Sequence, residues 1–355
     1  MATVASATLN PNKVVTREKG IRGDAGANGE DGQGFNLVRE SKLANPIVKI
    51  LSPNYPAEVG FDNLTWTRAS AGRGFNKYGQ LASADQDIPR ESEQGWILEG
   101  AGENLLLNSD DLSTQSATVT SDPHTLSFFG SGSVTLSGAH TATLSGTGEN
   151  DRVSLSFTPT AGSLTLTVSG DVNYAQLEQE QFSTSYITSE GTKGTRAPDI
   201  VTMPAFYNTP FLLEDFSIYF KVYFDGFTSS DDFIFSLPNG EDDDDLTVCG
   251  FCNDGSLTLR ISDGTTSADC TTSILSNTQY DVCLVKQENL ITLYINGSSV
   301  DDQAHSLIVP TGTNGIVKIG GNESGTTKNM FGKIYNFRIY DFALNESESK
   351  LMAGV

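Results

Sequence analysis

The sequence predicts an all-β protein, and two observations favour this class. Of its 355 residues only 19% are charged and 37% are hydrophobic, so Ser, Thr, Asn and Gly supply much of the surface. That composition is typical of β-rich extracellular proteins rather than of helical cytosolic enzymes. Apolar and polar residues also alternate over many short runs that end at glycine-containing turns, which is the period of antiparallel strands with one buried face.

The N-terminal region predicts an arm followed by a fibrous stalk. Residues 1–19 show no periodicity and predict a docking arm. Over residues 20–34 glycine recurs at every third position, as the crowded axis of a collagen triple helix requires. The repeat glycines are Gly20, Gly23, Gly26, Gly29 and Gly32. The stalk is short and contains no proline, so trimeric structure must hold it on one or both sides. A flexible glycine-rich linker is the alternative.

The middle of the chain predicts two β-rich segments. Residues 35–109 are interpreted as a linker and a β-rich shaft segment, with one strand over Ile47–Leu51 before a proline-containing connection. Residues 110–199 are predicted to form a small β-sandwich module, because Ser, Thr and Gly dominate and apolar residues recur at every second position within short runs.

The C-terminal region has the strongest strand pattern. Phe216–Phe224 alternates throughout, and Gly332–Tyr340 predicts a last strand that returns beside it. Asp254–Gly255 and Asn296–Gly297 each separate two apolar runs, which predicts tight hairpins. Asn345, followed three residues later by a glutamate, predicts a capping box and a short closing helix.

The charge distribution argues against two classes of partner. The net charge is −22, with +2 over residues 1–52, −11 over 53–199 and −13 over 200–355. Binding to nucleic acid or to an anionic membrane surface needs clustered Lys and Arg, so neither partner is expected. No apolar run approaches the roughly 18 residues of a membrane-spanning helix, and the first residues lack the pattern of a signal peptide, so neither membrane insertion nor export is expected.

The densest acidic run gives the candidate metal site. Four aspartates follow one another after a Pro-Asn-Gly turn, in a loop of the C-terminal region, and are Asp242, Asp243, Asp244 and Asp245. They form either a solvated acidic loop or a calcium site, since carboxylate oxygens are calcium ligands. No other cofactor is indicated. The candidate ligand loop comprises Asp231, Asp232 and Asn322.

The cysteines do not complete a metal-binding pattern. The chain has four, Cys249, Cys252, Cys270 and Cys283. The first two have the CxxC spacing, but no second pair or histidine pair accompanies them, and in a strand they face opposite sides. Free buried thiols are expected, and one disulfide within residues 249–283 is the alternative.

Residues 210–355 resemble the concanavalin A-like lectin/glucanase jelly roll in its laminin-G or pentraxin style. The resemblance rests on Phe216–Phe224, on Tyr294–Gly297 and on Gly332–Leu344. It implies a domain over residues 200–355 of a fold that serves lectins, adhesins, spacers and glycanases alike. Glucanases of this fold carry a Glu-x-Asp-x-x-Glu strand, which this sequence lacks, so a catalytic residue is not expected and the protein is predicted not to be an enzyme.

Residues 60–200 resemble a segment of bacteriophage tail-fibre and tail-tip proteins. The matching stretches are Trp66–Ala71, Gly95–Asp110, Tyr174–Ile187 and Thr195–Asp199. Such proteins usually carry a carbohydrate-binding module between the two halves. The insert here, residues 110–173, is short and lacks the tryptophans on which sugars stack, which departs from that pattern.

Together these features predict a homotrimeric bacteriophage fibre, of the tail or the head, located in the virion. Residues 1–19 are expected to bind other virion proteins, and the C-terminal domain is expected to attach to host cell-surface glycan without catalysis. Two alternatives remain. One is a purely structural or capsid-decorating fibre without a specific receptor, and the other is a glycan-degrading tail spike.

Overall fold

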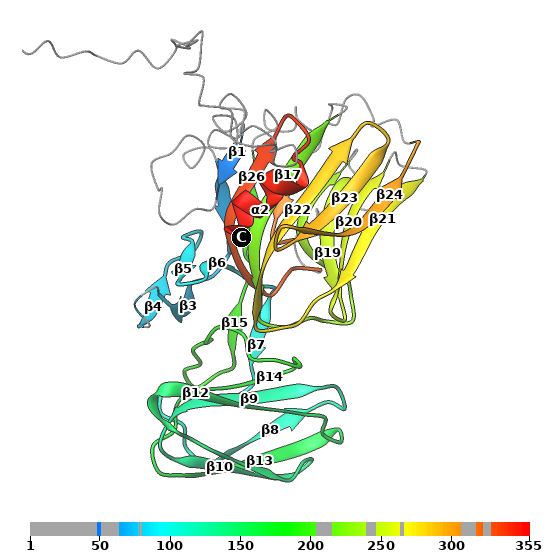
Figure 1. The fold of residues 1–355 in the computed structure, drawn as a ribbon. Helices are drawn as coiled ribbons and strands as arrows, with labels where there is room; N and C mark the ends of the chain where they lie inside the picture. The colour runs from blue at the N-terminus through cyan, green and yellow to red at the C-terminus, as the bar shows by residue number, and fades with distance from the viewer. Residues whose placement is uncertain are drawn as a thin grey trace, which may run out of the picture. The chain divides into compact units, whose positions relative to one another are not determined.

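The computed structural model describes residues 48–50, 64–76, 78, 80–203, 215–238, 246–262, 266–306, 317–321 and 328–355. The chain divides into two units, residues 1–42 and 43–355, and every described residue belongs to the second. This part is nearly all-β, as predicted, with one helix among the described residues (Figure 1). The predicted arm and glycine repeat lie outside the described residues, as do Asp242–Asp245 and Asn322.

A sheet of eight strands forms one layer of the C-terminal jelly roll (Figure 1). Its order is β24-β23-β22-β17-β26-β6-β5, and β1 also pairs with β26. The strands are β24 (Ser298–Ala304), β23 (Leu290–Ile295), β22 (Thr278–Gln287), β17 (Phe216–Phe224), β26 (Gly332–Tyr340), β6 (Gly95–Leu98), β5 (Arg90–Ser92) and β1 (Val48–Ile50). The predicted return of the last strand is confirmed, because β26 pairs antiparallel with β17 along its length.

A sheet of seven strands forms the facing layer, in the order β2-β16-β25-β18-β19-β20-β21. The strands are β2 (Thr65–Thr67), β16 (Ile200–Thr202), β25 (Lys318–Ile319), β18 (Asp232–Pro238), β19 (Leu246–Asn253), β20 (Ser256–Ser262) and β21 (Ser267–Ser273). Both predicted hairpins are confirmed: Asn253 pairs with Ser256, and Ile295 pairs with Ser298. The Asx-Gly residues of each turn have positive φ angles, as this turn requires.

The core of the jelly roll fills the space between the two sheets. Alternate residues of β17, from Phe216 to Phe224, point into it together with Ile334, Phe337 and Ile339 of β26. These side chains are buried because the period of two places one apolar face of each strand against the opposite sheet.

The opposite face of the eight-stranded sheet is covered by helix α2 (Glu346–Ala353). The predicted capping box is confirmed, since Asn345 Oδ1 accepts from the backbone N–H of Glu348 at 2.9 Å. Tyr219 donates from its hydroxyl to the carbonyl of Met352, which ties the helix to β17.

Strands from the segment 35–109 complete the jelly roll. β1, β5 and β6 join the eight-stranded sheet, and β2 joins the seven-stranded one. Trp66 and Trp96, on β2 and β6, pack against the core, with their ring centroids 5.5 Å apart. Both tryptophans therefore have a packing role.

The middle module is a small β-sandwich, as predicted. One sheet has the order β11-β10-β13-β8 and the other β12-β9-β14. The strands are β11 (Ala142–Ser145), β10 (Ser133–Gly138), β13 (Gly162–Ser169), β8 (Gln115–Val119), β12 (Gly148–Phe157), β9 (His124–Gly130) and β14 (Asn173–Glu178). Its own apolar core includes Leu126, Phe128, Leu136, Leu164 and Leu177.

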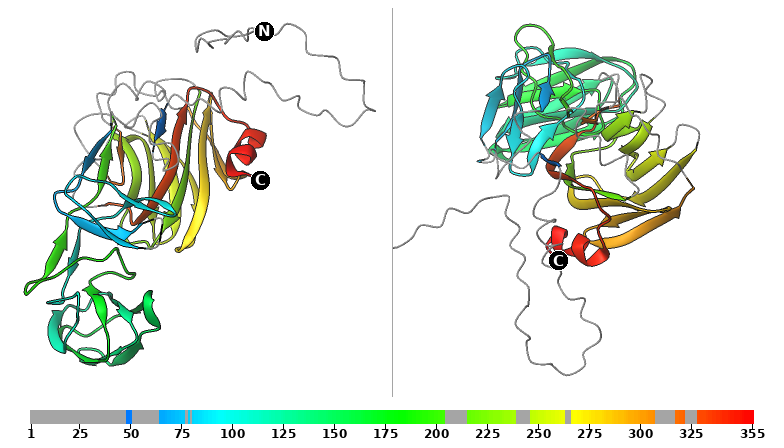
Figure 2. Two further views of the ribbon diagram at one scale, coloured as in Figure 1. Left: turned by 90° about the vertical axis from the view of Figure 1, so that its left-hand side faces the viewer. Right: turned by 90° about the horizontal axis from the view of Figure 1, so that it is seen from above.

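The chain enters and leaves this module through a two-stranded ladder. β7 (Gly102–Asn104) pairs antiparallel with β15 (Gly194–Arg196), and the two strands lie side by side in Figure 1. In the register, Asn104 faces Gly194. Figure 2 shows the ribbon from two further sides. The Asn104 amide donates to the carbonyls of Ala175 and Ile187, so the ladder is joined to the module by hydrogen bonds. A ribbon of β3 (Gly72–Phe75) and β4 (Leu81–Ala84) lies earlier in the chain.

Candidate functional site

A buried ion-pair cluster lies where the ladder meets the jelly roll. Three arginines and two carboxylates contribute, and all five side chains are 2% exposed or less. They are Arg68, Arg90, Arg196, Glu99 and Asp199. Asp199 accepts from Arg68 at 2.9 Å and also from Arg90. The cluster joins four chain segments that are up to 131 residues apart in the sequence.

Glu99 is the centre of this cluster. Its carboxylate lies 2.9 Å from Arg90 and 3.2 Å from Arg196, and it accepts from the backbone N–H of Ser185 at 2.7 Å. Burial alone raises the pKa of a carboxyl, but Arg196 and Arg90, with the hydrogen bonds from Ser185, outweigh it and hold the pKa of Glu99 well below its usual value. Glu99 is therefore a fixed anion that positions the Ser185 loop.

Three of the sequence stretches quoted for the phage-fibre resemblance contribute residues to this cluster. Arg68 lies in Trp66–Ala71, Glu99 in Gly95–Asp110, and Arg196 with Asp199 in Thr195–Asp199. Arginines and acids that lie far apart in the sequence, in strands and between them, give no signal of pairing from the sequence alone.

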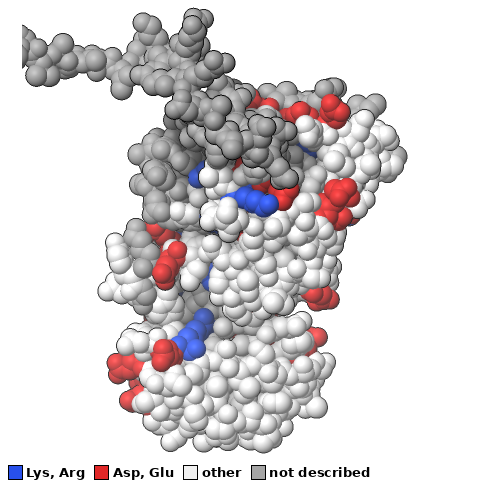
Figure 3. Space-filling model, in the orientation of Figure 1, with Lys and Arg blue, Asp and Glu red and all other residues white. Residues whose placement is uncertain are grey.

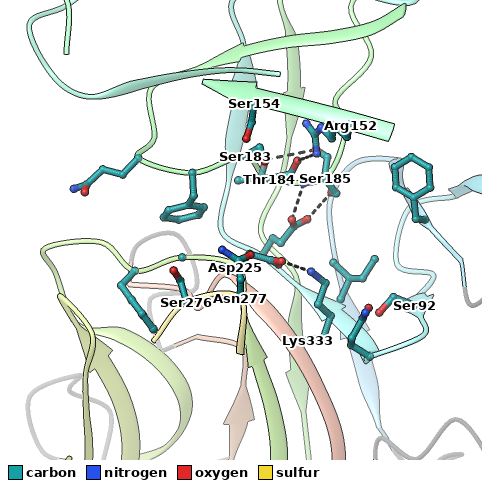
Figure 4. A pocket seen from close by; sticks show the side chains of 18 of the residues that line it. Ser92, Arg152, Ser154, Ser183, Thr184, Ser185, Asp225, Ser276, Asn277 and Lys333 are labelled. Carbon is teal, nitrogen blue, oxygen red and sulfur yellow. Dashed lines mark hydrogen bonds and ion pairs between the residues drawn. The ribbon is translucent and has the colours of Figure 1, made fainter. Parts of the chain in front are cut away.

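A cavity of about 660 Å³ borders this cluster (Figure 4). The loop after β14, residues 181–185, lines it together with β12 of the module. The jelly roll contributes the segment after β17, residues 225–227, the β21–β22 turn at 276–277, and Lys333. Figure 4 shows Ser154 and Arg152 facing Ser276, Asn277 and Asp225 across the space. The cavity thus lies between the two parts of this unit, and we call it the inter-module cleft.

The charges in the cleft are mostly compensated. Asp225 forms an ion pair with Lys333, whose ammonium also lies 4.9 Å from the ring centre of Tyr223. Arg152 donates to the Thr184 carbonyl at 2.5 Å and to the Ser127 hydroxyl at 2.8 Å. Burial raises the pKa of Asp225, and the Lys333 ammonium opposes that rise.

Neutral polar groups and phenyl rings make up much of the remaining lining. Hydroxyls come from Ser154, Ser183 and Ser276, and amides come from Gln181 and Asn277. The phenyl rings belong to Phe75, Phe182 and Phe227. Hydroxyl and amide groups both donate and accept hydrogen bonds, so this lining suits a ligand that presents many hydroxyls beside apolar C–H faces.

Phe182 fixes the loop that forms one wall of the cleft. Its ring meets that of Phe331 edge-on at 5.1 Å between centroids. A Cβ added to Gly226 would lie 2.0 Å from Cδ1 of Phe182, so the ring rests directly on this backbone. Glycine at 226 is therefore required for the close approach of the loop to the jelly roll.

Of the predicted ligand residues, the structure describes Asp231 and Asp232. Asp232 is 4% exposed and accepts from both the backbone N–H and the hydroxyl of Thr228, at 2.8 and 2.7 Å. Asp231 accepts from the Asn253 amide at 3.1 Å. Both carboxylates thus form hydrogen bonds within their own surroundings, and a ligand role for them stays a prediction. Asn322 and the four consecutive aspartates lie outside the described residues.

The four cysteines are free and buried, as expected. Cys252 contributes to the core between the two large sheets, whereas Cys249 packs with Phe233 and Phe251 on the other face of the sheet. The opposite orientation predicted from their spacing is confirmed. In the described ranges, no three His, Cys, Asp or Glu side chains lie together in a way that could hold a metal ion.

The inter-module cleft had no signal in the sequence. Arg152, Asp225 and Lys333 are isolated charges in strands or turns, and their neighbours gave no motif. The Phe182–Ser185 loop lies in Tyr174–Ile187 and Glu99 lies in Gly95–Asp110, two stretches of the phage-fibre resemblance, but neither stretch predicted a cleft.

Comparison with known proteins defines the C-terminal domain. Residues 198–348 match the model of the concanavalin A-like lectin/glucanases superfamily. The domain is accordingly a concanavalin A-like lectin/glucanase domain, as the resemblance in the sequence implied. Searching the curated proteins gave no match.

Among solved structures, the chain is similar to receptor-binding domains of botulinum neurotoxins. The domain of the C/D mosaic serotype is 12% identical with a TM-score of 0.36, over 44% of this chain and 40% of that one. The type G domain is 14% identical with a TM-score of 0.35, over 47% and 40%. A binding domain of neurotoxin DC, solved in complex with SialylT, is 17% identical with a TM-score of 0.36, over 44% and 39%. The chain thus covers about two fifths of each of these structures.

Within the part of the chain that the structure describes, no helix has the length and apolar character needed to cross a membrane.

Proposed function

We propose that this protein is a structural fibre of a bacteriophage virion, of the tail or the head, that attaches to saccharides of the host surface without catalysis. The observation that carries the attachment role is the inter-module cleft, in which hydroxyl, amide and phenyl groups line a cavity beside a lectin/glucanase-superfamily domain. The phage context rests on the resemblance of residues 60–200 to tail-fibre and tail-tip segments.

The absence of catalysis is part of the proposal. A glycosidase needs one carboxyl that is protonated near neutral pH and a second that is free to act as nucleophile or base. Three carboxyls line the cleft, those of Glu93, Glu99 and Asp225. Glu99 is held between two arginines, which lower its pKa, and Asp225 is paired with Lys333, so a single carboxyl, that of Glu93, is left for acid or base chemistry. One carboxyl does not make the pair that a glycosidase needs.

The fibre is proposed to be a homotrimer, held by the glycine repeat over residues 20–34 and docked to other virion proteins by residues 1–19. Three copies of a weak site on one fibre raise the effective affinity by avidity. Sedimentation equilibrium should then give a mass near three times 38.0 kDa, and a monomer contradicts the trimeric stalk.

Two measurements test the role as a whole. Antibody labelling of virions should place the protein on an appendage, and the purified protein should compete with phage for adsorption to host cells. Absence of the protein from virions refutes the fibre assignment. Release of reducing ends from host polysaccharide refutes the non-catalytic mechanism and supports a glycan-degrading spike.

A further inference from the structure

We infer that the inter-module cleft is a composite binding site for an uncharged oligosaccharide, to which the inserted sandwich and the jelly roll each contribute one wall. This inference rests on the proposed attachment function and specifies its site and ligand class. It differs from a site on the jelly roll alone, because Ser154, Arg152 and Phe182 come from the inserted module and Asp225, Ser276 and Asn277 from the jelly roll.

The charge of the lining argues for an uncharged ligand. Five charged side chains face the cleft: Glu93, Glu99, Asp225, Arg152 and Lys333, which sum to −1. Glu99 is paired with Arg90 and Arg196, and Asp225 is paired with Lys333. The Arg152 Nη atoms donate to neutral oxygens of Thr184 and Ser127. Glu93 and Arg152, the remaining two, have opposite signs. The lining therefore has no excess of cations to pair with the carboxylates of a uronate or sialylated glycan, so such ligands are disfavoured. The surface seen in Figure 3 is mostly uncharged, with acidic groups at separate points, so it offers no large basic area to collect a polyanion.

The neutral lining argues for a saccharide rather than a lipid or an apolar peptide. Ser154, Ser276, Asn277 and Gln181 are exposed, so their polar groups are accessible. Phe75, Phe182 and Phe227 are each partly exposed, which leaves apolar surface between the hydroxyls. A sugar ring presents the complementary pattern, with hydroxyls at its edge and C–H groups on its faces.

The cleft is also preorganised, which reduces the entropy lost on binding. Ser185 is held by Glu99, and Thr184 is held by Glu178, whose carboxylate accepts from the Thr184 N–H at 2.8 Å and from its hydroxyl at 2.7 Å. The wall that carries residues 181–185 is therefore fixed on both sides by buried carboxylates.

The test blocks each wall separately in the full-length protein. Ser154→Trp fills the cleft from the sandwich, and Ser276→Trp fills it from the jelly roll; both serines are exposed, so the bulky side chains do not disturb a core. Ser137→Trp is the matched control, an exposed strand serine of the same sandwich outside the cleft. Circular dichroism and melting temperature verify folding of all three.

Binding is measured on a panel of uncharged hexose and N-acetylhexosamine oligosaccharides with uronic-acid counterparts. We expect binding to uncharged members only, a loss of at least tenfold in both cleft variants, and less than twofold change in Ser137→Trp. Affinity should change less than threefold between 50 and 500 mM NaCl, because screening acts on charge pairs.

Each alternative outcome overturns a defined part of the proposal. If both cleft variants still bind the panel, the cleft is not the binding site, but the attachment function is unaffected. Loss in only one cleft variant refutes the composite site, and preference for the uronic-acid members refutes the ligand class. If neither the panel nor host cells are bound, the attachment function itself fails.

Discussion

The Glu99 cluster gives the sharpest prediction about stability. In Glu99→Gln the side chain keeps its shape and can still accept from Ser185, but Arg90 and Arg196 lose the anion between them. The cluster, formally +1 in the native protein, becomes +2 while its side chains stay 2% exposed or less. Removing one partner of a buried ion pair costs on the order of 3–5 kcal/mol. Because the hydrogen bond from Ser185 is retained, we expect the free energy of unfolding to fall by about 3 kcal/mol, near the lower end of that range.

The assay is urea unfolding followed by tryptophan fluorescence. The chain has two tryptophans, Trp66 and Trp96, and both pack on the jelly-roll core next to the cluster. The melting temperature should also fall, by about 2–4 °C for each kcal/mol in a domain of 150–250 residues.

Glu103→Gln is the matched control. Glu103 pairs with Lys193 at 3.2 Å on the neighbouring ladder, and both side chains are nearly half exposed. Such a pair contributes at most about 1 kcal/mol. If Glu99→Gln unfolds at the same urea concentration as Glu103→Gln, the cluster does not carry the stability argued here, and that result would falsify the reasoning.

Acid titration of the native protein gives a second readout of the same residue. The pKa of Glu99 is lowered by folding, so its contribution is present above the unfolded-state pKa, about 4.3, and is lost as the pH falls further. Glu99→Gln should therefore differ most from the native protein near neutral pH, and the difference should shrink in acid.

Three further predictions concern other parts of the chain. Burial raises the pKa of Glu180 to about 7 and that of Asp232 to about 6. Because the folded state binds these protons more tightly than the unfolded state, the melting temperature should rise as the pH falls from 8 towards 5, and Glu180→Gln should weaken that rise. Gly226→Ala should destabilise the protein by about 1–3 kcal/mol through overpacking against Phe182, and an unchanged urea midpoint would count against the tight contact. The four buried cysteines, whose thiol pKa values burial raises, should react with a thiol reagent only after denaturation; rapid labelling of the native protein contradicts this.

The elements of the fold were predictable where local rules decide them. The period of two located β17 and β26, and Asx-Gly pairs located two hairpins, because backbone sterics alone select these turns. The capping box at Asn345 follows from hydrogen bonds within four residues. The participation of β6 in the jelly-roll sheet was not predicted, because its partner β26 lies more than 230 residues away and short strands carry no mark of their partner. β5 joins the sheet through β6.

The candidate site was less predictable for a related reason. The inter-module cleft lies where two separately packed cores meet. Its charged residues pair with residues that are distant in the sequence and come close only in the folded chain. Asp225 and Lys333, for example, are 108 residues apart. Acid-rich sequence drew attention to Asp231 and Asp232, whose burial and local hydrogen bonds could be seen only once the strands were placed.

The β7–β15 ladder has a consequence for how such a protein can change. The chain enters the sandwich after Asn104 and leaves it before Gly194, and these two residues are paired. The sandwich is therefore a self-contained insertion whose two ends adjoin. Insertions with adjoining ends are the ones a host fold tolerates best. Exchange of this insertion would replace one wall of the cleft and leave the lectin-type core untouched, so recombination there offers a single-step route to a new binding preference.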